Sequence, residues 1–330
     1  MAISSKLKSV LNLLADGGFH SGTELSESLG VSRSAICKQL QGLAELGIEF
    51  TAVSGKGYKL HRPLQLLSMK EIEHYLSKQA DGLLEGIEIH DLIASTNTHL
   101  LQQAHASGMQ GIACFAEFQS AGKGRRGRNW VSPFGCNIYL SLLWRYQNGP
   151  ASLAGLSLAV GVAVVRALNE MGIEGVGLKW PNDIYWRQKK LAGILIEVSG
   201  EAGGPCDAVI GLGLNCYIPR EAAANIDQAW IDLDSILGRP THSIRNQLAA
   251  VLLNHILPVV AEFERQGLSD YLNEWRRYDC MQGNAVNINL GQQYYQGVVE
   301  GVDEQGMLLV KDEKQRVKTF ASGEISIRKL

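Results

Sequence analysis

The sequence predicts an α+β protein built from three parts. Residues 1–64 contain two short helical segments followed by an alternating segment with a glycine-rich tip. Residues 65–276 mix apolar, β-rich runs with long helical runs, and residues 277–330 are short alternating strands joined by glycines and charged turns. With 330 residues, of which 45% are apolar, the chain is long enough to give several parts a substantial core.

The first part shows the pattern of a helix-turn-helix. Ser21 and Glu24 form a capping box at the start of one helix, and Gly30 ends that helix. Ser32 caps the next helix, whose apolar residues recur at helical spacing: Ile36, Leu40, Leu43 and Leu46. Because only "LGVS" joins the two helices, we expect them to pack as a pair.

The segment "IEFTAVSGKGYKL" follows, and its alternation around a glycine-rich tip predicts a β-hairpin. A helix-turn-helix with a hairpin is a winged helix, which we expect to bind DNA. The candidate DNA-binding residues lie on the second helix and the hairpin tip: Ser32, Arg33, Ser34, Lys38, Gln39 and Lys56. The alternative is a helical interaction domain without DNA, since acidic and basic residues nearly balance in this part.

A linker, "HRPLQLLS", leads to the second part, where Ser68 and Glu71 predict another capping box and the helix "MKEIEHYLSK". Strands are expected in "GIACFAEF", "CNIYLSLLW", "GVGLKW", "GILIEV" and "DAVIGLGLN". Two long helices are expected in "SLAGLSLAVGVAVVRALNEMG" and "IRNQLAAVLLNHILPVVAEFERQG". The last fifty residues change to short alternating strands, which predicts a small β-barrel.

Composition and residue spacing limit the kinds of site and the cellular compartment that we expect. The formal net charge is only −2, so an anion-binding site must be local. The six cysteines form no C-x-x-C pair and are typical of reduced thiols in a cytoplasmic protein. The longest uncharged helical run, residues 152–165, is too short to span a bilayer, so no membrane partner is expected. The eight histidines form no spaced pair typical of a metal site, and no structural metal is expected.

The stretch "GKGRRG", residues 122–127, matches the G-x-G-x-x-G pattern of dinucleotide-binding turns. That interpretation fails, because loop and strand rather than a helix follow it and no acid occurs before Glu170. A nucleic-acid patch beside Trp130 is a better alternative. Such a patch, however, does not need the three glycines, which instead favour a mobile loop closing over a small anion.

Five motifs occur in order: "STN" (95–97), "QSAGKGRRGRNW" (119–130), "KWPND" (179–183), "KLAGIL" (190–195) and "GLGLN" (211–215). Together they closely resemble the biotin–protein ligases. With a winged helix in front and a small barrel behind, the chain resembles the bifunctional ligase that also acts as a biotin operon repressor. The resemblance implies a central mixed-sheet domain of the biotin/lipoate ligase type and an SH3-like C-terminal barrel.

The resemblance also implies a reaction. Biotin and ATP form biotinyl-5′-AMP, and a lysine of a biotin carboxyl carrier protein, a subunit of acetyl-CoA carboxylase, then takes the biotin. Mg²⁺ is expected with the substrate phosphates. At the reacting centre the resemblance places Lys123, Arg125, Asp183 and Lys190. Many relatives carry arginine where this chain has Lys123, and lysine lacks the bidentate fork of arginine.

The remaining contacts implied by the resemblance fall into two sets. Biotin is expected to meet Ser95, Thr96, Asn97, Gln119, Gly122, Lys123, Gly124, Arg125, Trp130, Lys190, Gly193 and Gly211. ATP and the adenylate are expected to meet Arg125, Arg126, Arg128, Asn182, Lys190, Asn215 and Trp230. Capping or core-packing roles are alternatives for Ser95, Thr96, Trp130 and Asp183, and solvated or structural roles for Arg126 and Arg128.

The resemblance further implies a homodimer that forms when biotinyl-AMP is bound and then occupies operator DNA. Two alternatives stay open at the level of sequence. One is a transcription factor that senses biotin without ligase activity. The other is a lipoate–protein ligase, against which the "GRRGR" loop and the C-terminal barrel argue.

Overall fold

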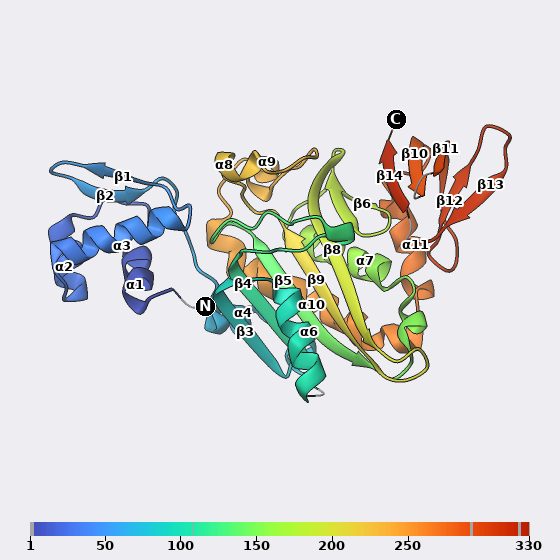
Figure 1. The fold of residues 1–330 in the computed structure, drawn as a ribbon, viewed down its shortest axis with the longest axis horizontal. Helices are drawn as coiled ribbons and strands as arrows, with labels where there is room; N and C mark the ends of the chain where they lie inside the picture. Colours follow the sequence, from blue (N-terminus) through green and yellow to red (C-terminus); the bar gives the residue numbers. More distant parts are fainter. Residues whose placement is uncertain (1–2, 108, 291–292, 323–324, 330) are drawn as a thin grey trace.

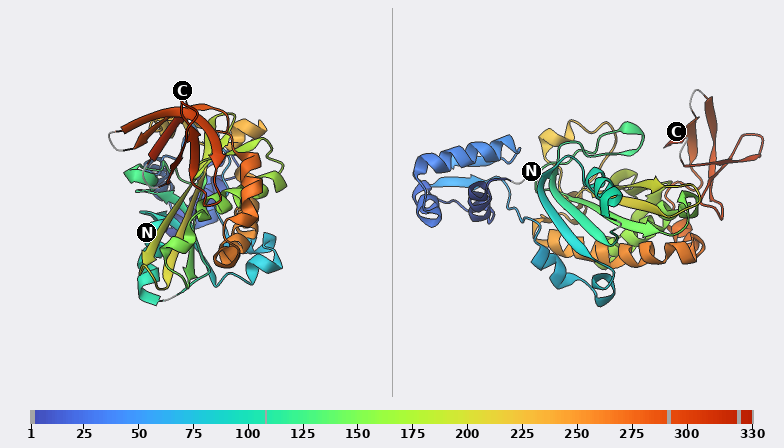
Figure 2. Two further views of the ribbon diagram at one scale, coloured as in Figure 1. Left: turned by 90° about the vertical axis from the view of Figure 1, so that its right-hand side faces the viewer. Right: turned by 60° about the horizontal axis from the view of Figure 1, so that its bottom comes forward.

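A computed structural model describes residues 3–107, 109–290, 293–322 and 325–329. The described chain forms three parts in a row: a winged helix, a central domain on a mixed sheet, and a C-terminal antiparallel sheet (Figure 1). The winged helix and the C-terminal sheet stand at opposite ends of the central domain, as the second view of Figure 2 also shows. The predicted order of the three parts is therefore confirmed.

The winged helix follows the sequence prediction closely. Its elements are α1 (Ser5–Leu14), α2 (Gly22–Leu29), α3 (Arg33–Glu45), β1 (Phe50–Val53) and β2 (Gly57–Leu60). The predicted capping box is present, because the Ser21 side chain accepts from Glu24 N and the Glu24 carboxylate accepts from Ser21 N. Gly30 ends α2 in the left-handed region that glycine favours. Ser32 caps α3.

The central domain is built on a seven-stranded sheet in the order β3-β4-β5-β9-β8-β7-β6. The strands are β3 (Gly86–Ile93), β4 (Ile112–Gln119), β5 (Ile138–Tyr146), β6 (Val176–Lys179), β7 (Asp183–Trp186), β8 (Lys189–Gly200) and β9 (Cys206–Leu214). Strands β3 and β4 are parallel, and all other neighbours are antiparallel. The predicted mixed sheet is thus confirmed.

Helices cover both faces of this sheet, as Figure 1 shows with α6 in front of the strands and α10 behind them. The helices of the central domain are α4 (Met69–Tyr75), α5 (Lys78–Asp81), α6 (Thr96–Ser107), α7 (Leu156–Glu170), α8 (Arg220–Ala223), α9 (Leu233–Leu237), α10 (Arg245–Gln266) and α11 (Ser269–Tyr278). Short 3₁₀ turns lie at Arg125–Gly127, Pro150–Leu153 and His242–Ile244. The main core forms where α7 and α10 pack on the sheet.

Two details of the helices differ from the sequence prediction. Ser68 caps α4, but the Glu71 carboxylate does not return to it and instead accepts from Gln65 and Asn246. The capping box predicted there is wrong, because a tertiary partner competes for the carboxylate. The helix also stops at Tyr75, since Leu76 is extended, and a new helix starts at Lys78.

The C-terminal part is a five-stranded antiparallel sheet in the order β13-β12-β11-β10-β14. Its strands are β10 (Ala285–Leu290), β11 (Gln293–Val302), β12 (Leu308–Lys311), β13 (Val317–Phe320) and β14 (Ile325–Lys329). A register shift between Val299 and Gly301 marks a bulge in β11. Trp180 anchors this part to the central domain by donating from Nε1 to Gly306 O at 2.9 Å.

Two helical stretches, Pro150–Glu170 and His242–Gln266, have the length and composition that could cross a membrane. In each, 67% of an apolar stretch of 18 residues is buried inside the protein. They are the helices that form the core against the sheet, so they are weak evidence for a membrane span.

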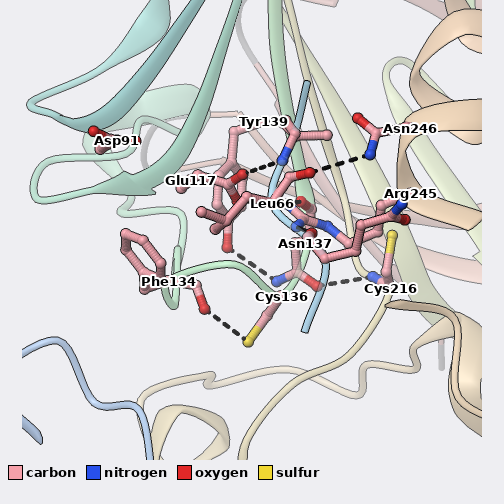
Figure 3. A network of polar contacts seen from close by, with 12 residues as sticks. Leu66, Asp91, Glu117, Phe134, Cys136, Asn137, Tyr139, Cys216, Arg245 and Asn246 are labelled. Atoms are coloured by element: carbon pink, nitrogen blue, oxygen red, sulfur yellow. Dashed lines mark hydrogen bonds and ion pairs between the residues drawn. The ribbon is translucent and has the colours of Figure 1, made fainter. Parts of the chain in front are cut away.

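A buried ion pair ties the interdomain linker to the sheet (Figure 3). Arg245 on α10 and Glu117 on β4 meet at 2.8 Å, and each side chain is only 1% exposed. Arg245 also donates to Gln65 O and Asn137 O, and Glu117 accepts from Leu67 N. Burial acts to lower the pKa of Arg245, but the charge and the hydrogen bond of Glu117, together with the nearby Cys216 and Cys136, outweigh burial and the pKa is raised.

We expect Glu117→Gln to destabilise the central domain by about 3 to 5 kcal/mol, because Arg245 would remain charged and buried without its partner. The measurement is urea unfolding of the full chain followed by tryptophan fluorescence. Glu262→Gln is the matched control, since the Glu262–Arg265 pair is exposed and should contribute little. Equal midpoints for Glu117→Gln and the wild type would contradict this account of the linker.

Candidate active site

A cavity of about 260 Å³ lies on the sheet face that α6 covers, where β4 and β9 end and β8 begins. It brings together most of the residues predicted from the sequence. Its lining includes Ser95, Thr96, Asn97, Gln119, Lys123, Gly124, Arg125, Arg128, Trp130, Asn182, Asp183, Lys190, Gly193 and Gly211. The five motifs, spread over about 120 residues, therefore converge on a single site.

One end of the cavity is neutral and polar. Ser95 and Thr96 lie at the start of α6, and Gln119 lies at the end of β4. Gln119 Oε1 accepts from the backbone N–H of Thr96 at 2.9 Å, and its Nε2 donates to Ser132 at 3.2 Å. Ser95 Oγ also accepts from Thr98 N at 3.4 Å, so its alternative capping role is fulfilled as well. These bonds fix the side chains before any ligand arrives.

Asn97 supports this end by holding its neighbours. Its Nδ2 donates to the Glu197 carboxylate at 2.9 Å, and Ser141 Oγ lies 2.5 Å from its Oδ1. A Cβ at Gly211 would lie 2.2 Å from Asn97 Oδ1, so Gly211 is required by this close packing. Both residues line the cavity, but the Asn97 amide is already hydrogen-bonded within the protein and Gly211 is already packed against it.

The loop from Gly122 to Trp130 crosses the cavity as a narrow hairpin. Trp130 N donates to Gly122 O at 2.8 Å, and Gly124 N donates to Arg128 O at 2.7 Å. A Cβ at Gly122 would lie 2.6 Å from Trp130 O, and Gly127 has a φ of 70°. The glycines of "GKGRRG" are thus explained by a tight loop rather than by a phosphate-binding turn.

Trp130 lies on a floor made of glycines. Gly193 on β8 is paired in register with Gly213 on β9. A Cβ at Gly213 would lie 2.4 Å from the Trp130 ring, and one at Gly193 would lie 3.2 Å from it. The ring can therefore rest against the sheet only because both positions lack side chains.

The cations of the site divide into two groups. Lys190, which is 8% exposed, forms an ion pair with Asp183 at 2.7 Å and lies 5.4 Å from the centroid of the Trp130 ring. Arg125 donates to Asn182 at 3.1 Å and to the backbone of Ser322 in the C-terminal part. Burial lowers the pKa of Arg125, and the nearby Asp183 only partly opposes this effect. These two cations lie at the same end of the cavity as Asp183.

Lys123 is directed elsewhere. Its Nζ lies 3.3 Å from Glu197, the carboxylate that also holds Asn97. In this structure its ammonium is therefore paired beside Asn97 rather than with Asp183, which pairs with Lys190. Arg128 is exposed but lines the cavity. Arg126 is exposed at the loop tip with a φ of 58°, and neither it nor Gly122 is among the lining residues.

A smaller cavity of about 50 Å³ adjoins the first and contains the remaining predicted residues, Asn215 and Trp230. It shares Trp130 and Lys190 with the larger cavity. Lys190 N donates to Ala229 O, which fixes the segment before Trp230 against β8. Asn215 donates to Ile231 O at 3.1 Å and is 4% exposed, so it also holds this segment in place.

Several residues of the site were not predicted from the sequence. They are Ser132, Ser141, Glu197, Gly213, Asn225, Asp227 and Gln228. Gly213 could have been found, because it stands in the same motif as Gly211. Glu197 interrupts the apolar run "GILIEV", which was a usable signal. Ser141 lies inside an apolar strand, and nothing in its local pattern marks it.

The predicted DNA-binding residues lie on the winged helix, apart from the cavity. Arg33, Ser34 and Lys38 are exposed on α3, and Lys56 is exposed in the β1–β2 turn. Ser32 is engaged as the cap of α3 and lies 2.9 Å from Ser34 Oγ. Gln39 accepts from Ser4 at 3.3 Å.

Comparison with known proteins agrees with this geometry. Residues 89–215 match the biotin/lipoate A/B protein ligase family, residues 6–59 an HTH domain, and residues 283–328 the biotin protein ligase C-terminal domain. The chain is 41% identical to the bifunctional ligase/repressor BirA of Escherichia coli over 97% of this chain and 96% of that one. It belongs to the bifunctional biotin–protein ligase/repressor family.

Two further relatives of this biotin–protein ligase support the same family assignment. The biotin–[acetyl-CoA-carboxylase] ligase of Mycobacterium tuberculosis is 34% identical over 77% of this chain and 94% of that one. The biotin protein ligase of Aquifex aeolicus, solved in complex with biotin and ATP, superposes with a TM-score of 0.63 at 27% identity. The superposition covers 75% of this chain and 100% of that one. A sensor without ligase activity and a lipoate ligase are therefore not favoured.

We expect Gly213→Ala to displace Trp130 from the glycine floor, because its new Cβ would lie 2.4 Å from the ring. Freed of this packing, the loop should be cut by trypsin after Arg125, Arg126 or Arg128 about tenfold faster, as expected for the loss of one or two kcal/mol of burial. Gly203→Ala, in the β8–β9 turn, is the control, since its Cβ would meet nothing within 4 Å. Equal cleavage of the two variants would show that Trp130 does not hold the loop.

Proposed function

We propose that this ligase activates biotin with ATP and transfers it to a lysine of a biotin carboxyl carrier protein, the subunit of acetyl-CoA carboxylase. In the first step a biotin carboxylate oxygen attacks the α-phosphorus of ATP, the bond to the β-phosphate breaks, and pyrophosphate leaves. In the second step the lysine amine attacks the carbonyl of biotinyl-5′-AMP, an amide forms, and AMP and a proton leave. The observation that carries this proposal is the Lys190–Asp183 pair in the larger cavity, whose Lys190 also lines the smaller one.

The neutral end of the large cavity suits the ureido ring of biotin. Ser95, Thr96 and Gln119 offer neutral donors and acceptors, and internal hydrogen bonds already orient Thr96 and Gln119. A neutral ring needs such partners, since a buried charge without a counterion would carry a large desolvation cost. We assign these three residues to ring recognition, with Asn97 and Gly211 shaping the wall behind them.

The charged end suits the reacting groups. Lys190 and Arg125 supply fixed cations where carboxylate and triphosphate must approach each other, and cations held in place stabilise charge as it grows on the phosphate oxygens. Asp183 pairs with Lys190 at 2.7 Å and so holds the ammonium in place. Lys123 acts through its loop backbone in this assignment, because its ammonium is paired with Glu197.

The smaller cavity suits the adenine, with Trp230 as the stacking surface and Asn215 holding its segment. Asp183 is the carboxylate at the charged end, and carboxylate oxygens are ligands that Mg²⁺ prefers together with substrate phosphates. We assign it to that ion, which would neutralise phosphate charge. The loop of residues 122–130 would then exclude water from the mixed anhydride until the carrier lysine arrives.

We expect Lys190→Ala to slow biotinyl-AMP formation by about 10²- to 10³-fold, the scale for removing one fixed partner of a developing charge. The measurement is biotin-dependent exchange of labelled pyrophosphate into ATP. Lys189→Ala is the matched control, since Lys189 is the exposed neighbour on the same strand. A Lys190→Ala rate within tenfold of the wild type, with native circular dichroism, would overturn the assignment.

The regulatory half of the proposal concerns the winged helix. With few exposed cations, one copy makes few phosphate contacts and binds DNA weakly at physiological salt. Two copies on a palindromic operator would gain both affinity and specificity. We propose that biotinyl-AMP promotes dimerisation through the central domain, that the dimer represses the biotin operon in the cytoplasm, and that the unliganded monomer serves the carrier protein.

We expect biotinyl-AMP to double the sedimentation mass and to promote operator binding. Changing Arg33 and Lys38 together to Ala should weaken that binding by at least tenfold without affecting the mass, because the two cations lie on the exposed face of α3. Fluorescence anisotropy of labelled operator at fixed salt provides the binding curve.

Lys70→Ala is the control for that measurement, since Lys70 is exposed on α4 of the central domain. An unchanged mass with biotinyl-AMP would contradict the dimerisation scheme. Full-strength operator binding by the double variant would contradict the assignment of α3.

A further inference from the structure

Four potential metal ligands converge between α6 and the sheet, outside the cavities described above. We call Glu88, His90, His99 and Cys114 the α6 cluster; one ligand atom from each lies within 4.8 Å of all the others. Histidine spacing in the sequence does not reveal this group, because its members come from β3, α6 and β4. The residues meet only when the parallel pair of strands forms under the helix.

The register of the sheet explains the convergence. Glu88 is paired with Cys114 across β3 and β4, and His90, two residues after Glu88, points to the same face. His99 reaches down from α6, and its Nε2 lies 2.7 Å from Glu88 Oε2. His90 Nε2 lies 3.1 Å from the same oxygen. Two imidazole nitrogens thus lie within hydrogen-bonding distance of one carboxylate oxygen.

His99 Nε2 lies between a carboxylate oxygen and an amide nitrogen. Its Nε2 lies 2.7 Å from a carboxylate oxygen, which can only accept, and 3.1 Å from Gln103 Nε2, which can only donate. One ring nitrogen cannot donate and accept at once. Turning the Gln103 amide over would place its oxygen against Glu88 Oε1, which now receives Gln103 Nε2 at 2.9 Å. Nε2 therefore hydrogen-bonds to only one of these two neighbours, and a cation on its lone pair would make Nε2 and Glu88 Oε2 ligands of the same ion.

The surroundings allow an ion to enter and to be held. The side chains of Glu88, His90 and His99 are 27 to 31% exposed, whereas Cys114 is fully buried. Cys114 packs among Leu100, Ile112 and Leu143, which form an apolar wall behind the cluster. The open side faces solvent, and the thiol closes the inner side.

We propose that the α6 cluster binds a divalent transition-metal ion of the Zn²⁺ class, with two imidazoles, one carboxylate and one thiolate as ligands. Each of these donor types binds zinc in tetrahedral sites, in which Zn–N is about 2.0–2.1 Å and Zn–S about 2.3 Å. Ligand atoms in such a site lie about 3.3–3.8 Å apart. Modest side-chain rotation would widen the 2.7 and 3.1 Å contacts to Glu88 and shorten the longer separations, which reach at most 4.8 Å. Gln103 does not reach the ion itself but orients the Glu88 carboxylate, since its Nε2 donates to Glu88 Oε1 at 2.9 Å.

The ion would be structural for the ligase reaction. Strand β3 leads directly to Ser95, α6 begins at Thr96, and β4 ends at Gln119. The metal therefore joins the three elements that present the neutral end of the cavity. Because only the folded chain brings the ligands together, binding should raise the melting temperature.

The test uses the full chain, stripped with a chelator and then titrated with Zn²⁺ in competition with a chromophoric chelator. We expect one ion per chain, a higher melting temperature, and a thiolate-to-metal charge-transfer band when Co²⁺ replaces Zn²⁺. His99→Ala should weaken Zn²⁺ binding by at least about 100-fold and Gln103→Leu by about tenfold, in line with direct and supporting contacts. Cys114→Ser should abolish the Co²⁺ charge-transfer band.

His255→Ala is the matched control. His255 pairs with Glu170 at 2.7 Å and is 26% exposed, which closely resembles the His99–Glu88 pair outside the cluster. His90→Gln provides a second, milder variant should His99→Ala unfold. Zn²⁺ binding that is unchanged in His99→Ala and His90→Gln would overturn the proposal. So would an equal loss of Zn²⁺ binding in His255→Ala, or the absence of the Co²⁺ thiolate band in the folded wild type.

Discussion

The pairing of Gly193 with Gly213 across β8 and β9 is the constraint on which the site depends. It leaves a strip of sheet without side chains, wide enough for the Trp130 ring. Lys190 lies three residues before Gly193 on the same strand, and β7 places Asp183 opposite Gly193. The floor, the covering ring and the charged pair are therefore positioned by the β8–β9 and β7–β8 ladders, the second of which shifts register between Ile184 and Tyr185.

The site is also tied to the rest of the chain. Strand β4 carries Gln119 in the cavity and, two residues earlier, Glu117 in the buried pair that holds the interdomain linker. Lys8 of the winged helix meets Asp91 on β3 at 2.9 Å, and Arg62 of the linker pairs with Asp234 and stacks on Tyr217. On the other side, Arg125 contacts the backbone of Ser322. Strands and loops that carry ligand-facing groups thus also carry contacts to both flanking parts.

Much of this organisation could be predicted from the sequence. Hydrophobic periodicity and capping residues predicted the winged helix correctly, because Ser21, Glu24 and Gly30 act on neighbouring residues and need no distant partner. The motifs gave most of the cavity, because they are local in sequence. Residues whose roles depend on distant partners escaped prediction. Glu71 leaves its expected cap for Asn246, Lys123 turns to Glu197, and the α6 cluster forms only through strand register.

The central claim is that one pocket joins a ureido-binding end to a cation-lined centre for adenylation. The most direct measurement is the exchange of labelled pyrophosphate into ATP by the unmodified chain with biotin, with lipoate, or with neither. The account predicts exchange that requires biotin and does not occur with lipoate. Exchange with lipoate alone, or biotin binding without exchange, would contradict it.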